Sequence, residues 1–261
     1  MASSSTPQSS LPWMERWLPT AARPYAMVAR LDKPIGTWLV AWPCFWSIAV
    51  AAKNGELPDL KMMALFGFGS AILRGLGCTV NDLLDRDIDK KVERTKNRPL
   101  ASGALTLSQG LYFLPQAYLG FTINWGALLG WAAIKESLDV EVILPLYAAG
   151  ICWTLVYDTI YAHQDKEDDV KVGVRSTALW FGNMTKYWIS AFAAASIGNL
   201  ALSGYNADLA WPYYPLLTPA AAHLAWQIST VDLSKRSDCN RMFVSNKWVG
   251  ALVLQLNAYI N

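Results

Sequence analysis

The chain has 261 residues, of which 53% are hydrophobic, 16% are charged and 13 are Trp. This composition is typical of a membrane protein, because Trp and Tyr concentrate at the headgroup level of a bilayer. The net charge of +2 argues against a nucleic-acid-binding surface, and four scattered cysteines without CxxC spacing argue against a disulfide framework or a zinc site.

Seven apolar stretches are predicted to cross the membrane as helices, since about 20 apolar residues span the hydrocarbon core. They lie near residues 35–52, 61–81, 108–133, 141–159, 186–204, 209–229 and 247–261. Pro115 and Gly120 predict a kink or a partial re-entry in the third stretch. We therefore expect an all-α fold, a polytopic transmembrane helix bundle. A soluble bundle of very apolar helices is the alternative.

The basic residues predict an orientation. With the N-terminus inside, the inner segments hold 18 of the 22 Lys and Arg residues, which is the positive-inside pattern. These segments are 1–34, 82–104, 160–186 and 230–247. Both acidic clusters described below then face the same inner side.

The N-terminus predicts a division of the chain. We expect residues 1–22 to be a separate segment, either a remnant targeting sequence or a helix on the membrane surface, and residues 23–261 to be the membrane domain. The segment is rich in Ser but has no Arg before Arg16, so its targeting signal is weak.

The first acidic cluster ends the second predicted span and runs from Asn81 to Asp89. Asp82, Asp85 and Asp89 are spaced i, i+3 and i+7. A helix places residues at this spacing on one face.

The second acidic cluster ends the fourth predicted span. If that helix continues, Asp158, Tyr161, Asp165 and the pair Asp168 and Asp169 share a face. Both clusters therefore predict a row of carboxylates at the end of an apolar helix.

The clusters repeat each other, because Asp82 and Asp89 match Asp158 and Asp165 at a constant offset of 76. Carboxylates on one helix face repel one another, and near a membrane a cation is the expected compensation. Hard oxygen ligands favour Mg²⁺, which fills its coordination shell with phosphate oxygens. The pattern thus predicts two facing acidic helix ends that hold Mg²⁺ and, through it, a diphosphate. A solvated, charged helix end is the structural alternative for either cluster alone.

These motifs resemble the UbiA superfamily of membrane prenyltransferases, and within it the 4-hydroxybenzoate polyprenyltransferases of ubiquinone biosynthesis. The resemblance runs from about residue 23 to the C-terminus with one gap. It rests on Arg30–Thr37, on Asn81-Asp82-x-x-Asp85-x-x-x-Asp89, on Arg94-Thr95-x-Asn97-Arg98-Pro99-Leu100-x-Ser102-Gly103, on Asp158-x-x-Tyr161-Ala162-x-x-Asp165-x-x-Asp168-Asp169, and on Val172-Gly173-Val174-x-Ser176-Thr177-Ala178.

The resemblance implies a helix bundle around a central cavity, usually of nine helices, with the prenyl tail in a lipid-side groove. The metal-binding acids it implies are Asp82, Asp85, Asp89, Asp158, Asp165 and Asp169. Of these we expect the catalytic role to fall on Asp82, Asp85, Asp158 and Asp165. The expected substrate contacts are Arg30, Asn81, Arg94, Tyr161 and Lys171.

The expected reaction is Mg²⁺-dependent transfer of a polyprenyl group from an allylic diphosphate to the ring carbon ortho to the hydroxyl of 4-hydroxybenzoate. Metal ions stabilise the departing pyrophosphate, and a cavity inside the membrane keeps water from the allylic cation. The expected location is the mitochondrial inner membrane with the motifs on the matrix face. The lipid bilayer and other proteins of ubiquinone synthesis are the expected partners.

One stretch differs from the family pattern. Relatives have four spans between the two acidic motifs, whereas this chain has room for two and lacks a Tyr-Pro-x-x-Lys-Arg stretch before Pro115-Gln116. The missing segment is about two helices long, so both motifs still face one side. We interpret the chain as a splice form or as the product of a gene model with a lost exon.

Three other functions remain open at this stage. The acceptor could be another phenolic compound, since the motifs do not separate such acceptors. Paired acids inside a membrane also mark ion-coupled transporters. The chain could also be a non-catalytic, truncated isoform that pairs with the full-length enzyme.

Overall fold

The computed structural model describes residues 16–19, 26, 30–52, 56–84, 115–172 and 176–258. Throughout these ranges the regular structure is helical, and the all-α class predicted from the sequence is confirmed. The long helices are α3 (Ile35–Val50), α4 (Leu60–Leu84), α6 (Pro115–Ile123), α7 (Trp125–Lys135), α8 (Val140–Ala162), α11 (Thr185–Asn206), α12 (Tyr213–Thr230) and α13 (Arg236–Ala258). The short ones are α9 (Lys166–Val172), α10 (Thr177–Phe181) and the 3-10 helix η1 (Gly182–Met184).

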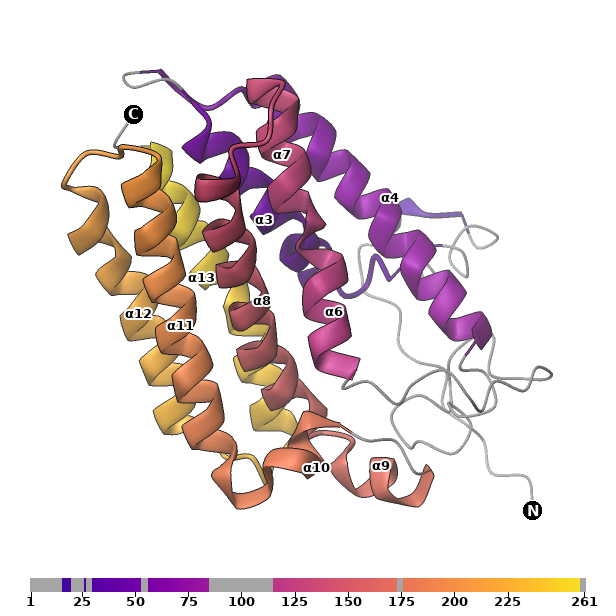
Figure 1. The fold of residues 1–261 in the computed structure, drawn as a ribbon. Coiled ribbons are helices and arrows are strands. Elements are labelled where there is room, and N and C mark those ends of the chain that lie inside the picture. The colour runs from indigo at the N-terminus through magenta and orange to yellow at the C-terminus, as the bar shows by residue number, and fades with distance from the viewer. Residues whose placement is uncertain are drawn as a thin grey trace, which may run out of the picture.

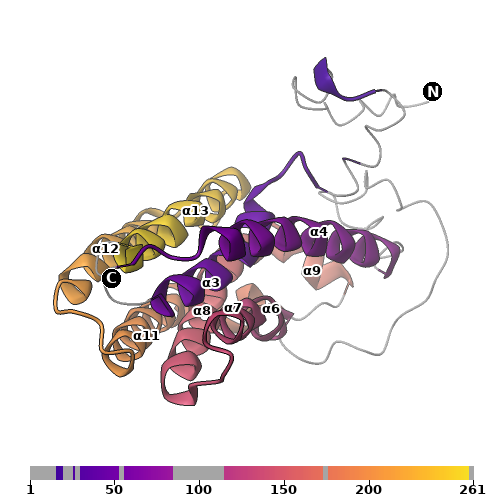
Figure 2. The same cartoon turned by 90° about the horizontal axis from the view of Figure 1, so that it is seen from above.

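Helix α8 lies at the centre of the bundle, with α11, α12 and α13 on one flank and α4 on the other (Figures 1 and 2). It packs most extensively against α11, and it also contacts α6, α7 and α13. Helix α3 lies between α7, α13 and α4. Helix α3 is therefore held in part by helices that come much later in the sequence, α7 and α13.

Two small residues bring α3 and α7 together. Gly126 and Gly130 of α7 lie one helical turn apart, and a Cβ on either would collide with Cys44 or Ser47 of α3. Ser47 Oγ also approaches the Gly126 carbonyl at 3.5 Å. Inside a bilayer the hydrophobic effect does not drive helices together, so this close backbone approach stabilises the pair through packing.

Buried polar groups link other helices. Trp46 Nε1 donates to the Gly250 carbonyl at 2.9 Å, which joins α3 to α13. Trp153 Nε1 donates to Asn246 Oδ1 at 2.9 Å, which joins α8 to α13. An indole N–H in an apolar core costs free energy unless it has a partner, so these two bonds fix where α13 lies.

Five predicted spans agree with α3, α4, α8, α11 and α12 to within four residues at each end. The third, residues 108–133, was predicted as a span with a kink or a partial re-entry, and its described part consists of two helices, α6 and α7. The break falls at Asn124 and not at Gly120. The Asn124 side chain donates to the Gly120 carbonyl at 2.7 Å and to Thr154 Oγ1 at 2.9 Å, so the break is stabilised from α8.

The seventh predicted span, residues 247–261, begins too late, because α13 starts at Arg236. The first turns of α13 are polar, so a search for apolar stretches does not find them. They are held by Asp238, which accepts from the Asp232 amide at 2.8 Å and from Arg241 Nε at 2.9 Å.

Two of the described helices are long and apolar enough to cross a membrane, over Leu60–Cys78 and Val140–Ala162, and Ile35–Val50 is a shorter apolar helix. On α4 the residues Leu65, Phe68, Ile72 and Leu76 are exposed, as expected for a surface in contact with lipid. The total of seven spans stays a prediction, as does the division of the chain at residue 22.

Candidate active site at the acidic end of the bundle

The second acidic cluster lies where α8 ends. Helix α8 stops at Ala162, a tight turn through Asp165 follows, and the chain resumes as α9. The predicted single helix face is therefore wrong. Asp158 lies on α8, Asp165 in the turn, and Asp169 on α9, so the carboxylates are presented by a helix–turn–helix corner.

Helix α9 is anchored by Asp168, a buried carboxylate. Its Oδ1 accepts from Lys171 Nζ at 3.0 Å, and its Oδ2 lies 3.4 Å from Arg236 Nη2 at the start of α13. The backbone amides of Asp168 and Asp169 donate to the Asp165 carbonyl at 2.9 and 2.8 Å. Lys171, predicted to contact substrate, thus forms an ion pair that holds α9, and Asp168 positions its acidic neighbours.

Buried hydrogen bonds fix the corner from the side of α8. Thr159 and Thr177 are joined through their hydroxyls at 2.8 Å, and Gln116 Oε1 accepts from the Thr177 amide at 3.1 Å. His163 Nδ1 lies 2.9 Å from the Thr159 carbonyl and must carry the proton there, because a carbonyl only accepts. Burial lowers the pKa of His163, which favours the neutral ring.

The first cluster is only partly described. Helix α4 extends through Asn81 and Asp82 to Leu84, as predicted, but nothing is described of these side chains. Three predicted site residues lie outside the described residues: Asp85, Asp89 and Arg94. Both views place the end of α4 and helix α9 on the same flank of the bundle (Figures 1 and 2). Within the described ranges, no three acidic, His or Cys side chains come together as a metal site.

Arg30 lies in the turn before α3, with a left-handed backbone at φ +56° that is costly for a residue with a side chain. The turn is closed by the Lys33 amide, which donates to the Arg30 carbonyl at 3.0 Å. This geometry sets the direction in which the chain enters α3.

Arg74 is a candidate residue to which the sequence analysis assigned no role. It projects from α4 onto Gly36 of α3, where a Cβ would collide with the guanidinium. Its Nε is buried and has no hydrogen-bond partner, and its charge lies within electrostatic reach of Tyr157 on α8. A charged residue inside an apolar span is itself a functional signal, and it could have identified Arg74 from the sequence.

A column of aromatic rings leads from the bundle core to the acidic corner. Ring centroids are 5.0 Å apart for Trp46 and Trp153 and for Trp153 and Tyr157, then 5.7 Å for Tyr157 and Phe243, and 4.3 Å for Phe243 and Tyr161. Tyr161 and Phe243 are the half-buried members, and Tyr161 follows Asp158 on α8 by about one helical turn. The corner is thus bordered by aromatic faces on its membrane side.

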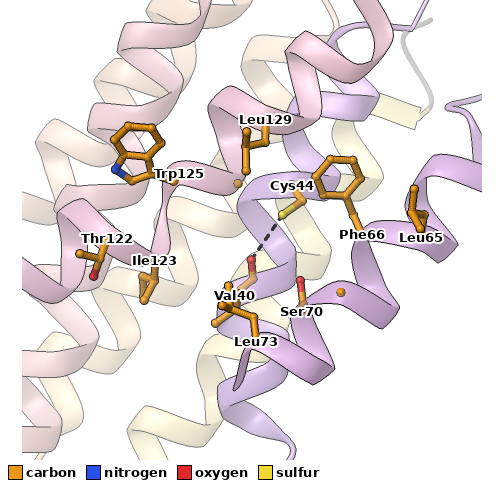
Figure 3. A pocket seen from close by; sticks show the side chains of 12 residues that line it. Val40, Cys44, Leu65, Phe66, Ser70, Leu73, Thr122, Ile123, Trp125 and Leu129 are labelled. Carbon is orange, nitrogen blue, oxygen red and sulfur yellow. Dashed lines mark hydrogen bonds between the residues drawn. The ribbon is translucent and has the colours of Figure 1, made fainter. Parts of the chain in front are cut away.

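An apolar cavity of about 340 Å³ lies between α3, α4, α6 and α7. Figure 3 shows Val40, Cys44, Ser70 and Leu73 on one side of it and Ile123, Trp125 and Leu129 on the other. Its lining is mainly apolar, with Cys44, Ser70, Thr122 and Trp125 as the side chains that carry polar atoms, so it suits a hydrocarbon chain.

Comparison with known families decides what this arrangement belongs to. The profile of the UbiA prenyltransferase family matches residues 40–114 and 112–251. This chain belongs to the UbiA prenyltransferase family. The two matches meet at residues 112–114, next to the predicted deletion. UbiA prenyltransferases generally use a divalent metal.

Named relatives agree with the family. The chain is 56% identical to mitochondrial 4-hydroxybenzoate polyprenyltransferase of Arabidopsis thaliana, covering 92% of this chain and 69% of that one. It is 49% identical to 4-hydroxybenzoate geranyltransferase 2 of Lithospermum erythrorhizon, covering 92% of each. It is 46% identical to mitochondrial 4-hydroxybenzoate polyprenyltransferase of Homo sapiens, in a match that covers 90% of this chain and 74% of the human one. The prediction of a membrane prenyltransferase is confirmed.

The alignments also support the shortening of the chain. The match to the Arabidopsis protein spans 282 positions but includes only 92% of the 261 residues of this chain. Roughly 40 aligned positions therefore have no counterpart in this chain, which is the length of about two membrane helices. A solved structure from work on digeranylgeranylglyceryl phosphate synthase in membranes has the same fold, with a TM-score of 0.58 and 16% identity over 91% of this chain and 97% of that one.

Proposed function

We propose that this chain transfers a polyprenyl group from an allylic prenyl diphosphate to the ring carbon ortho to the hydroxyl of 4-hydroxybenzoate, as a step of ubiquinone biosynthesis. The observation that carries the proposal is the identity of 45–56% to relatives named for 4-hydroxybenzoate polyprenyl transfer, in a chain that retains both acidic motifs. The mitochondrial relatives and the basic inner segments support a place in the mitochondrial inner membrane, with the acidic end toward the matrix.

The acidic corner offers part of the oxygen ligand set that Mg²⁺ prefers. Asp158, Asp165 and Asp169 offer carboxylate oxygens within one short stretch, no thiol lies in it, and His163 uses Nδ1 for the Thr159 carbonyl. With Asp82, Asp85 and Asp89 of the first motif, they would hold the metal. When bound, Mg²⁺ supplies positive charge that stabilises the pyrophosphate leaving group.

The chain's own residues account for the remaining requirements. Arg74 offers a half-buried guanidinium with an unpartnered Nε, which suits the carboxylate of the acceptor. The faces of Tyr161 and Phe243 can shield the allylic cation and attract it through their π electrons. The cavity between α3, α4 and α7 can hold the apolar prenyl chain away from water.

A non-catalytic isoform is the second candidate function. The observation that favours it is the loss of roughly 40 aligned positions, about the length of two helices. A different phenolic acceptor remains the alternative within prenyl transfer, because nothing described in the chain distinguishes one phenol from another.

The test is prenyl transfer from geranyl diphosphate to labelled 4-hydroxybenzoate, in membranes that contain this chain, with Mg²⁺ and then with EDTA. We expect Mg²⁺-dependent product that disappears in Asp82→Ala and Asp158→Ala. Asp139→Ala is the matched control, since Asp139 precedes the opposite end of α8 and its side chain caps nothing. If only a version with the two helices restored is active, the second candidate is correct.

A further inference from the structure

A second cavity lies beside the acidic corner, outside the site described above. It has a volume of about 430 Å³ and is bordered by the turn after α8, by α9, by η1 with the start of α11, and by the loop from α12 to α13. Unlike the apolar cavity, it is lined mainly by polar and charged side chains. The residues are His163, Gln164, Lys166, Glu167, Gly182, Asn183, Lys186, Leu233, Ser234 and Arg236.

The charge of this cavity is positive. Three of its described lining residues are cations, Lys166, Lys186 and Arg236, against one acid, Glu167. Arg236 is engaged with Asp168 and, at 3.8 Å, with Glu167. Lys186 Nζ donates one bond to the Ser229 carbonyl at 3.2 Å, and Lys166 has no ion-pair partner in the described part of the chain. Two ammonium groups therefore keep donors for a ligand.

Gln164 is an independent sign of a missing partner. This lining residue is 6% exposed, and its Nε2 is buried without a hydrogen bond. A buried amide donor without an acceptor costs free energy. A ligand oxygen that accepted a hydrogen bond from this amide would remove that cost.

The surroundings place the cavity at the membrane surface. Trp180, Tyr187 and Trp188 are exposed, Trp180 to 68%, and they lie on α10 and the first turn of α11 beside Lys186. The rings of Phe181 and Trp188 stack at 5.4 Å, which fixes this aromatic rim. Exposed Trp and Tyr of this kind lie at headgroup depth, where basic pockets between helices bind lipid phosphates.

We propose that this cavity is a phosphate-binding site, filled by the headgroup of an anionic phospholipid. The ligand's phosphate oxygens accept from Lys166, Lys186 and the Gln164 amide, while its acyl chains lie against the aromatic rim. The site goes beyond prenyl transfer and does not depend on it. Because Lys166 begins α9 and Arg236 begins α13, an occupied site ties the acidic corner to the bilayer surface.

The test measures binding by the full chain in neutral detergent micelles. The thermal unfolding midpoint and native mass spectra are recorded with dioleoylphosphatidylglycerol, with dioleoylphosphatidylcholine, and with inorganic phosphate. We expect retention of phosphatidylglycerol and a raised midpoint. Lys166→Gln with Lys186→Gln should weaken its binding by about 30-fold. Lys61→Gln with Lys135→Gln removes the same charge far from the cavity, and this control should bind like the unchanged chain.

A third variant separates binding from folding. Gln164→Leu removes an unpartnered donor, so we expect the lipid-free protein to be at least as stable as the unchanged chain while its lipid affinity falls. Equal protection by inorganic phosphate would support the phosphate site with a soluble ligand in place of a lipid. The proposal is overturned if no phosphate compound raises the midpoint, or if the Lys166/Lys186 double variant binds phosphatidylglycerol as tightly as the Lys61/Lys135 control.

Discussion

The hydrogen bond between Trp153 and Asn246 allows a direct measurement of what holds α13 against α8. The two side chains are 1% and 0% exposed, and their bond is 2.9 Å long. Asn246→Leu leaves the indole N–H unpaired in an apolar core, which costs about 1–3 kcal/mol. Trp153→Phe leaves Asn246 Oδ1 unpaired while its Nδ2 keeps the Met242 carbonyl at 3.1 Å.

The double variant removes both polar groups, so its loss of stability should be smaller than the sum of the single losses. Coupling energies of interhelical bonds in membranes average about 0.6 kcal/mol and reach about 1.7 kcal/mol. We expect about 1 kcal/mol or more here, because both side chains are fully enclosed. The assay is unfolding by sodium dodecyl sulfate in mixed micelles, followed by circular dichroism at the helix band.

Trp180→Phe serves as the control for loss of an indole, since Trp180 is 68% exposed. It should leave the unfolding free energy almost unchanged. Additive single losses, with a coupling below about 0.3 kcal/mol, would refute the reasoning. The bond would then contribute nothing specific to the position of α13.

Three further predictions concern the acceptor, the prenyl chain and acid. Arg74→Met should raise KM for 4-hydroxybenzoate by about tenfold or more, because one charge-assisted contact is lost. Gly36→Ala should also raise this KM, because the added methyl group displaces the guanidinium. An unchanged KM in steady-state kinetics contradicts the assigned role. The leucine side chain of Gly69→Leu would point into the apolar cavity, so this variant should reduce transfer from long prenyl diphosphates more than from geranyl diphosphate. Gly77→Leu is the control, because Gly77 is equally unobstructed on the same helix but lies outside the cavity, and it should not show this difference. Hydrogen bonds from Ser234 and, to a smaller extent, from Lys235 lower the pKa of Asp232 from 3.8 to about 2. The ionised Asp232 therefore stabilises the folded protein above pH 3.8, and this contribution is lost as pH falls toward 2. Thermal unfolding of Asp232→Asn should lack this part of the acid dependence.

The sequence predicted those helices whose positions depend on apolar length, and it missed features that depend on distant partners. α4 and α8 were located well because each contains a long apolar run. The break at Asn124 could not be predicted, because it is stabilised by Thr154 on another helix. The start of α13 was missed because its polar first turns are stable only through bonds within the loop before it, such as that from the Asp232 amide to Asp238.

The same holds for the candidate site. The acidic motifs were found by spacing alone, and α4 continues into the first of them as expected. The corner between Asp158 and Asp169 was not foreseen, because helical spacing is equally consistent with a continuous helix. The sequence analysis assigned no role to Arg74, since its contact with Gly36 joins two helices and leaves no periodic signal.

The bond from Trp46 to the Gly250 carbonyl has a consequence for biogenesis. Trp46 on α3 has its hydrogen-bond partner 204 residues further along the chain. Helix α3 therefore waits in the bilayer with an unpaired indole N–H until α13 is inserted, and the bundle closes only after most of the chain has been made. A premature stop before Gly250 would leave α3 without this closure, in a form that membrane quality-control proteases can recognise.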